Sequence, residues 1–212
     1  PMEDGEEVRT FRVDAPITYL DDHEMCGLRA SFYKLPKEIY LKAGHCHQLL
    51  FWDYTTQFCG ICGGRMKKES YISKRCTVCG NEIWPSPAIA VITLIRNGDK
   101  ALLVHANNFR KNFYGLVAGF VELGETLENA ARREICEEVG LTVGELKYIS
   151  SQPWPYPNGL MVGFMTDYVS GRITLQQSEL SDGQWFTKDN LPTLPEKLSI
   201  ARQLIDMWLK EQ

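Results

Sequence analysis

The sequence has no apolar run that approaches the roughly 18 residues of a membrane-spanning helix. Its acidic beginning lacks the basic residues and the apolar centre of a signal peptide. Positive charge is not in excess, because the formal net charge is −4, and this argues against a broad nucleic-acid-binding surface. There is no internal repeat and no low-complexity segment. We therefore expect a soluble protein of the cytoplasm that has no membrane partner.

The length of the chain is sufficient for one sizeable core and an appendage. It has 212 residues, of which 44% are hydrophobic. Near the beginning, short apolar pieces alternate with charged residues, at 11–13, 17–20 and 28–35. This part of the sequence predicts small strands and turns, and it contains no catalytic pattern.

Four of the seven cysteines have the spacing of a metal site. Cys59 and Cys62 form one CxxC pair and Cys76 and Cys79 form another, with 13 residues between the pairs and a glycine after each. Four thiolates close a tetrahedral shell, so the pattern predicts one structural Zn²⁺ rather than a catalytic one. Chance spacing or disulfides are the alternative. The odd cysteine count and the metal spacing favour a reducing compartment.

The most informative stretch is an acidic helix predicted over 126–139. Its apolar stripe has four-residue spacing and consists of Leu127, Ala131, Ile135 and Val139. Glu134 and Glu138 fall within or beside that stripe, and Glu137 lies one step further round the helix. Like charges crowded in this way need protonation or a cation, and hard oxygen ligands favour Mg²⁺ or Mn²⁺. The alternative is an exposed acidic helix without a metal.

This stretch resembles the Nudix box. Gly119 is followed after five residues by Glu125, and after seven more by an unbroken match from Arg133 to Leu141. The resemblance implies hydrolysis of a nucleoside diphosphate linked to another group. The alternation of strands and helices suggests an α/β fold in which a mixed sheet is sandwiched between helices. A closing helix is expected over 197–209. The expected strands are 88–95, 101–105, 116–118, 146–149, 160–169, 172–175 and 184–186.

A second motif narrows the resemblance. The stretch from Ser151 to Met161 alternates proline with aromatic residues, so it presents Trp154 and Tyr156 as rigid faces that suit flat rings. Taken alone, it could equally be a loop whose aromatics fill the core. After a Nudix box it resembles the SQPWPFPxS array of the NADH pyrophosphatase (NAD-capped RNA hydrolase) subfamily. Tyr156 replaces a phenylalanine of that array, and Gly159 replaces its serine.

The subfamily resemblance implies an organisation and a set of site residues. We expect a short N-terminal α+β segment over 1–55, a zinc ribbon over 56–84 and a Nudix hydrolase domain over 85–212. The implied catalytic residues are Glu138 and Glu137. The implied Mg²⁺ or Mn²⁺ ligands are Glu134, Glu137, Glu138 and Glu179. The alternative for Glu179 is a surface residue in a turn. The implied brace is Glu125 with Arg133. The implied substrate-binding residues are Trp84, Ala118, Phe120, Trp154, Tyr156, Asn158, Gly159, Met161 and Ala201.

The function implied by the resemblance is hydrolysis of the pyrophosphate bond of NADH or NAD⁺ to nicotinamide mononucleotide and AMP. Two or three Mg²⁺ or Mn²⁺ ions, one structural zinc and a homodimer are also implied. One alternative is removal of an NAD cap from RNA, helped by the basic residues 65–75 of the ribbon, which otherwise form a solvated face. An ADP-ribose pyrophosphatase, or a nucleotide sensor that does not hydrolyse its ligand, would also fit the resemblance.

Overall fold

The computed structural model describes residues 9–13, 15, 24–109 and 113–211. The chain forms two compact units. The first contains residues 1–87 together with 154–158, and the second contains 88–153 together with 159–212. In the described part of the chain, no helix is both long and apolar enough to cross a membrane. The three-part division at 55/56 and 84/85 stays a prediction.

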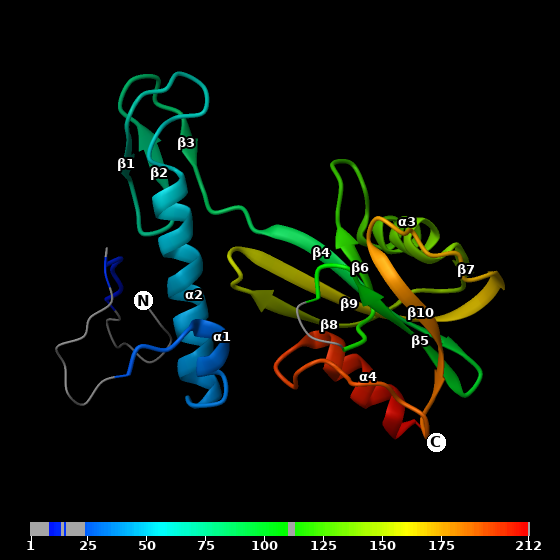
Figure 1. Cartoon of the computed structure of the whole chain (residues 1–212). Coiled ribbons are helices and arrows are strands. Elements are labelled where there is room, and N and C mark those ends of the chain that lie inside the picture. Colours follow the sequence, from blue (N-terminus) through cyan, green and yellow to red (C-terminus); the bar gives the residue numbers. More distant parts are fainter. Residues whose placement is uncertain (1–8, 14, 16–23, 110–112, 212) are drawn as a thin grey trace. The chain divides into compact units, whose positions relative to one another are not determined.

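The first unit begins with helices and ends in a small sheet (Figure 1). Its elements are α1 (Leu28–Ser31), α2 (Lys37–Thr55), β1 (Met66–Lys68), β2 (Lys74–Cys76) and β3 (Glu82–Ile83). The three strands pair in the order β1-β2-β3, and both pairings are antiparallel.

The strands expected near the beginning of the chain are wrong where the structure describes that region, whereas a turn is present at 32–34. Residues 28–31 and 37–55 are helical, residues 11–13 form no strand, and 17–20 lie outside the described residues. The buried residues of α2 include Tyr40, Gly44 and Trp52. Their spacing is a multiple of four, which is helical, but a stripe of two aromatics and a glycine does not carry the aliphatic signal that identifies a helix.

Lys74 attaches the ribbon to the end of α2. Its ammonium group is 3.0 Å from a carboxylate oxygen of Asp53 and donates to the carbonyl oxygens of Asp53 at 2.6 Å and Thr56 at 3.1 Å. The Lys74 side chain is only 3% exposed and also lies over the ring of Trp52. A cation at a helix C-terminus satisfies carbonyl groups that have no partner within the helix. This lysine is therefore a structural link and not part of a basic surface.

The second unit contains a seven-stranded mixed sheet and two helices. Its elements are β4 (Ala88–Asn97), β5 (Lys100–Ala106), β6 (Val117–Phe120), α3 (Leu127–Val139), β7 (Leu141–Val143), β8 (Lys147–Trp154), β9 (Gly159–Gly171), β10 (Leu180–Thr187) and α4 (Ile200–Lys210). The main strand order is β10-β5-β4-β9-β7, with β6 paired to β4 and β8 paired to β9. Strands β4 and β9 are parallel, and the other pairings for which a register is defined are antiparallel.

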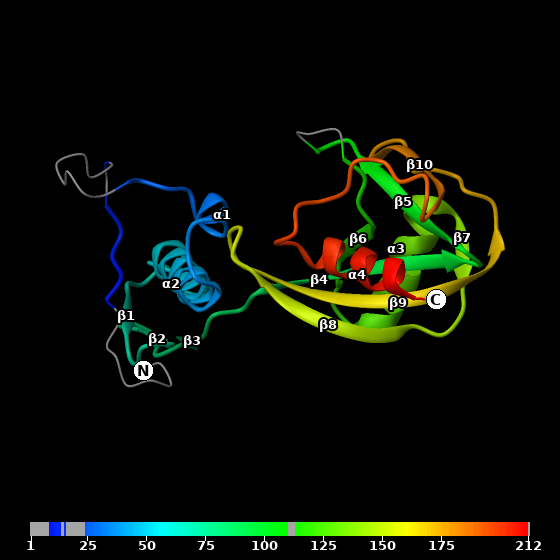
Figure 2. The same ribbon diagram turned by 90° about the horizontal axis from the view of Figure 1, so that it is seen from below.

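The two helices cover opposite faces of this sheet (Figure 2). Ile135 and Val139 of α3 are fully buried in one core cluster, and Leu204 and Trp208 of α4 are buried in another. The predicted α/β sandwich with a mixed sheet is confirmed. Burial of an aliphatic stripe from each helix supplies the main stabilisation of the unit.

The strand predicted over 172–175 is wrong. Strand β9 ends at Gly171, whose φ is 109°, and the following segment leaves the sheet. The N–H of Thr174 donates to the carbonyl of Val139 at 3.0 Å, and the N–H of Gln176 donates to the carbonyl of Glu138 at 2.9 Å. The segment satisfies its hydrogen bonds at the C-terminal end of α3 rather than at a strand edge. It thereby brings the turn that carries Glu179 to the acidic helix.

Candidate metal and catalytic site

The acidic helix has the ends that its sequence predicts. The side-chain oxygen of Thr126 accepts a hydrogen bond from the N–H of Asn129 at 3.2 Å, which caps the N-terminus of α3. Gly140 ends the helix in the left-handed region, with φ of 68°, and its N–H donates to the carbonyl of Cys136. The helix is thus fixed at both ends, and the positions of its glutamates follow from its rotation.

The three box glutamates differ in burial. Glu138 is 3% exposed, the Glu134 side chain is 12% exposed, and the Glu137 side chain is 53% exposed. The helical arrangement predicts that Glu134 and Glu138 are more buried than Glu137, and the exposed fractions agree. A buried carboxylate is costly unless a cation or a proton neutralises it.

Arg133 connects the loop before α3 to the helix itself. Its guanidinium donates to both carboxylate oxygens of Glu125, at 2.7 and 2.9 Å, and to the carbonyl of Phe120 at 2.9 Å. It also donates to Glu134 at 2.8 Å and to Glu137 at 3.1 Å. Bidentate pairing of this kind fixes geometry as well as charge. The geometry is that of the brace implied for Glu125 and Arg133.

The electrostatics of the brace follow from these contacts. The hydrogen bonds from Arg133, with one from the N–H of Glu122 at 2.9 Å, lower the pKa of Glu125 to about 2. The same carboxylates raise the pKa of Arg133 above its usual value, with the hydrogen bond to Glu125 as the largest cause. Glu125 is therefore ionised at neutral pH and permanently paired.

Glu138 has the opposite environment. Burial, followed by the charges of Glu134 and Glu179, raises the pKa of Glu138 to about 8, against a smaller effect of the N–H of Ala118. Burial also raises the pKa of Glu134. Glu138 and Glu179 line one cavity of about 330 Å³, so carboxylates from α3 and from the turn before β10 converge there.

The donor set at this cavity suits a hard divalent cation. Carboxylate oxygens are the ligands that Mg²⁺ and Mn²⁺ prefer, and a cation here would remove the mutual repulsion that raises these pKa values. Among the described residues, only the four cysteines place three or more ligand atoms within 4.8 Å of one another. The carboxylates are therefore less tightly gathered than the thiols.

Gly119 is required by the position of Glu134. A methyl group added at Gly119 of β6 would lie 1.9 Å from the carboxyl carbon of Glu134. Atoms cannot approach so closely, and the glycine is not needed for an unusual backbone angle, because its φ is not positive. The first glycine of the box thus makes room for a carboxylate that reaches the adjacent strand.

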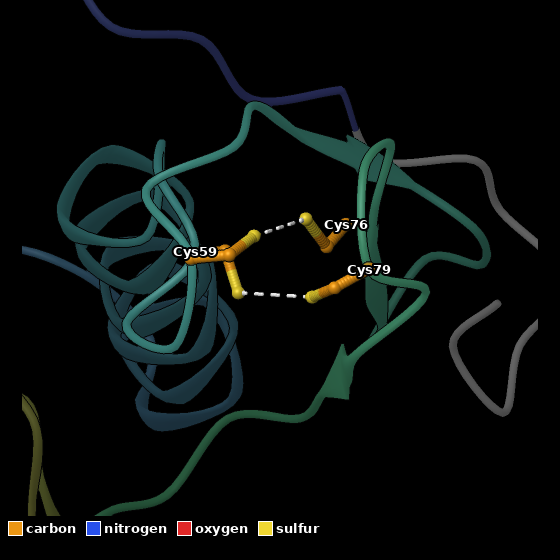
Figure 3. Close-up of side chains that lie close together, drawn as sticks. Cys59, Cys76 and Cys79 are labelled. Carbon is orange, nitrogen blue, oxygen red and sulfur yellow. Dashed lines mark hydrogen bonds between the residues drawn. The ribbon is translucent and has the colours of Figure 1, made fainter.

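The four cysteines form the cluster that their spacing predicts. The sulfur atoms of Cys59 and Cys79 are 3.7 Å apart, and those of Cys62 and Cys76 are 3.5 Å apart. Figure 3 shows Cys76 and Cys79 pointing toward Cys59 from the second CxxC segment. Gly63 and Gly80, which follow the two pairs, have φ of 72° and 73°, so each provides a tight turn that other residues adopt only with strain.

Backbone N–H groups prepare these thiols to bind a metal. The N–H of Ile61 points to the sulfur of Cys59, and the N–H of Val78 points to that of Cys76, each at 3.4 Å. Hydrogen bonds from the backbone of Cys79 and Val78 lower the pKa of Cys76 to about 6. Thiolates are the form that Zn²⁺ binds, so the cluster suits one zinc ion in a closed shell.

The aromatic motif packs within the first unit. The hydroxyl groups of Tyr156 and Tyr40 are 2.5 Å apart, and the ring of Trp154 meets that of Tyr156 edge-on, with centroids 5.1 Å apart. The guanidinium of Arg29 lies 5.5 Å from the Trp154 ring and 5.8 Å from the Tyr156 ring. Pro155 is buried and touches α2 where Gly44 leaves space for it. The aromatic residues of this motif therefore pack against other residues, which is one of the two roles that the sequence allows. The other role, binding the flat rings of a substrate, stays a prediction.

The remaining predicted substrate positions are spread over several elements. Ala201 is buried in the core between α4 and the sheet, and Ala118 and Met161 are half-buried against the same cluster. Phe120 and Trp84 are 65% and 55% exposed. Phe120 of β6 and Met161 of β9 both pair with Ala90 of β4, so Ala90 lies between them in the sheet.

Two further substrate positions lie next to each other in the chain. Asn158 donates to the carbonyl of Ser86 at 3.1 Å, and Gly159 begins β9 opposite Ala88.

The loop after β5 was missed as part of the site. Asn107, Asn108 and Phe109 line the same cavity as Glu138, together with Ser178. The sequence shows only a polar loop there, and no spacing relates it to the acidic helix. The loop is placed at the cavity by a contact between residues far apart in the sequence, because the N–H of Asn107 donates to the carbonyl of Glu179 at 2.8 Å.

We expect one zinc ion per chain, measured by elemental analysis of the purified protein. Cys76→Ser should abolish zinc binding, because the cluster loses a buried thiolate and its closed shell. Cys136→Ser is the matched control, since Cys136 lies on α3 outside the cluster, and it should retain the ion. Zinc retained by Cys76→Ser, or disulfides found in the native protein, would contradict a Cys₄ site.

We also expect Glu138 to make stability depend on pH when Mg²⁺ and Mn²⁺ are left out of the buffer. Folded Glu138 holds a proton up to about pH 8, whereas the unfolded residue loses it near the usual 4.5. The unfolding free energy should therefore fall as pH rises between these values, by at most about 5 kcal/mol. Glu138→Gln has no group that titrates at this position. The thermal midpoint of the variant should therefore rise relative to that of the wild type as the pH increases from about 4.5 to about 8. Parallel midpoint curves would contradict the shifted pKa.

Comparison with known proteins places this geometry in a family. A family model described as "NUDIX domain" matches residues 85–208. A protein of Pseudomonas aeruginosa named NAD-capped RNA hydrolase NudC is 40% identical over 206 residues, which are 97% of this chain and 74% of that protein. A protein of the same name from Haemophilus influenzae is 44% identical over 195 residues, 90% of this chain and 74% of that protein.

A solved structure agrees at the level of the fold. The crystal structure of a NUDIX hydrolase from Nitrosomonas europaea aligns with a TM-score of 0.63 and 19% identity, over 74% of this chain and 92% of that chain. With the family model covering more than half of the chain and the two relatives matching nearly all of it, the chain belongs to the NUDIX family and to the same subfamily as these NudC proteins.

Proposed function

We propose that this protein hydrolyses the pyrophosphate bond of NADH and NAD⁺, giving nicotinamide mononucleotide and AMP, with Mg²⁺ or Mn²⁺ bound at the acidic helix. The observation that carries this is the convergence of Glu138 and Glu179 on one cavity, with the charge of Glu134 nearby. A site that concentrates negative charge in this way binds an anionic diphosphate only through cations. The names of the NudC relatives indicate an NAD-linked substrate.

The residues have distinct proposed roles. Glu134, Glu137, Glu138 and Glu179 hold two or three divalent ions. When bound, these ions supply neutralisation of the diphosphate and a water molecule of lowered pKa. Glu138 would accept a proton from the water that attacks phosphorus while the bond from phosphorus to the bridging oxygen breaks, and Glu137 is the second candidate for this role. Arg133 and Glu125 keep the carboxylates in position.

The remaining predicted residues bind the substrate in this proposal. Phe120 offers an exposed ring on β6, with Met161 and Ala118 on the adjoining sheet surface. Trp84, Trp154 and Tyr156 are the further aromatic residues assigned to substrate binding. These assignments, with that of Ala201 and of Asn158 and Gly159, rest on the subfamily resemblance, as does a homodimer.

Removal of an NAD cap from RNA is the second candidate function, and the names of the relatives favour it. The ribbon gives it limited support. Lys74 is buried against α2, and Arg75 is 2.7 Å from Glu82 and 3.4 Å from Glu69. Much of the predicted basic surface is therefore neutralised within the first unit, and we favour the free dinucleotide.

A product assay tests the proposal. Purified protein is incubated with NADH, ADP-ribose and NAD-capped RNA in parallel, each with Mg²⁺ or Mn²⁺, and the products are separated by chromatography. We expect reduced nicotinamide mononucleotide and AMP from NADH, with a turnover at least about a hundredfold lower in Glu138→Gln. Glu128→Gln, an exposed position on α3, should leave turnover unchanged.

The relative rates decide between the candidates. Faster turnover of capped RNA than of NADH would make decapping the main activity, and faster turnover of ADP-ribose would favour the ADP-ribose pyrophosphatase. Binding of NADH without turnover of any substrate would overturn the enzyme proposal in favour of a sensor. Near-normal turnover by Glu138→Gln would remove the role assigned to that residue.

Gly119→Ala tests the geometry of the metal ligands. The added methyl group would displace the Glu134 carboxylate from β6, so we expect Mn²⁺ affinity to fall at least about tenfold while the fold is retained. Gly144→Ala is the matched control, because a methyl group there would make only ordinary contacts, the nearest at 3.6 Å. Titration followed by electron paramagnetic resonance measures bound Mn²⁺. Equal affinities in the two variants would show that Glu134 is not a ligand.

A further inference from the structure

The cavity that Glu138 and Glu179 line also has apolar and aromatic lining residues. Its volume is about 330 Å³, at the lower end of the range of pockets for small molecules, roughly 300–1,000 Å³. One wall carries Glu138 and Glu179. The apolar lining residues include Val104 and Leu116, and Phe109 adds an aromatic ring. Apolar surface and an aromatic ring next to a diphosphate site are suited to a nucleoside.

The Phe109 ring is held in one orientation. It stacks on the ring of Phe113 with centroids 4.3 Å apart and 19° between the planes, and it meets the ring of His105 edge-on. The N–H of Phe109 donates to the carbonyl of Ala106 at 3.0 Å, which closes a turn. Gly115 leaves space for the edge of the ring, since an added methyl group would lie 3.2 Å from it. A ring fixed on several sides can receive a flat ligand at little entropic cost.

The two loops that form the mouth of the cavity are tied to each other. The N–H of Asn107 donates to the carbonyl of Glu179 at 2.8 Å, and its side-chain amide donates to the carbonyl of Gln177 at 3.0 Å. The hydroxyl of Ser181 donates to the carbonyl of His105 at 3.1 Å. The distance between the acidic wall and the aromatic wall is thereby fixed before any ligand binds.

A dinucleotide needs such a second place. Its diphosphate joins two nucleosides. Phe120, a predicted substrate-binding residue with an exposed ring, does not line this cavity, whereas Ala118, another predicted substrate-binding residue, does. If one nucleoside lies at Phe120 and the diphosphate lies at Glu138, the other nucleoside has to leave the site in a different direction. This cavity provides apolar surface next to Glu138.

We propose that this cavity binds the second nucleoside of the substrate, with its base against Phe109 and its sugar beside Asn108 and Ser178 at the mouth. The amide of Asn108 and the hydroxyl of Ser178 can bond sugar hydroxyl groups. The inference rests on the proposed dinucleotide hydrolysis. It adds a specificity-determining residue, Phe109, from a loop that the sequence motif of the acidic helix does not predict.

Steady-state kinetics of Phe109→Leu with NADH and with ADP-ribose test this site. Loss of base stacking should raise KM for NADH about tenfold with little change in kcat. Phe109→Trp keeps an aromatic face and should restore KM. Tyr148→Leu is the control, because it removes an exposed aromatic ring of β8 that does not line the cavity.

The two substrates identify the bound nucleoside. A higher KM for both would place adenosine in the cavity, and a higher KM for NADH alone would place the nicotinamide nucleoside there. Unchanged KM for both substrates, or a loss of kcat alone, would overturn the inference. If the wild type hydrolysed neither substrate, the proposed function would be wrong, but the proposed nucleoside site would still be untested by these kinetics. Calorimetric titration with AMP and with nicotinamide mononucleotide would then decide the inference, since at least one should bind about tenfold more weakly to Phe109→Leu.

Discussion

The acidic helix can exist in its observed form because one cation, Arg133, is placed among its carboxylates. Five of its hydrogen bonds go to three glutamates and to a strand carbonyl. These bonds join the loop at Glu125, the end of β6 at Phe120 and the second half of α3 into one body. Arg133 neutralises Glu125 most effectively, and Glu138 lies too deep to share it. Without a bound cation, Glu138 is therefore neutralised by a proton rather than by Arg133, and a divalent cation at the cavity would replace that proton.

Much of the second unit could be predicted from the sequence because its signals are local. The caps at Thr126 and Gly140 depend on residues within one turn, and the burial of Glu138 follows from helical rotation. The cysteine cluster was predictable for a similar reason, since each CxxC pair and its glycine form a self-contained turn. Caps, helical rotation and CxxC turns depend on residues that are close in the sequence, so they can be predicted from one sequence alone.

The failures have a common physical cause, because each depends on a partner that is distant in the sequence. Helix α2 was missed because Gly44, unfavourable for a helix, is needed where Pro155 approaches it. Lys74 was counted with a basic surface, although its partners lie at the end of that same helix. The segment after Gly171 has an apolar pattern that suggests a strand, but its hydrogen bonds go to the end of α3. The Asn107 loop was overlooked for the same reason.

The path of the chain between the two units limits how the protein could have been assembled or divided. The boundary is crossed three times, because residues 154–158 belong to the first unit while the strands on either side of them belong to the second. A cut after Pro87 would therefore separate the turn at Tyr156 from its partner Tyr40 and leave two aromatic rings and a buried proline uncovered. The catalytic unit cannot be exchanged as a simple terminal module. Any recombination that preserves folding has to transfer the helices of the first unit with the hairpin turn that they cover.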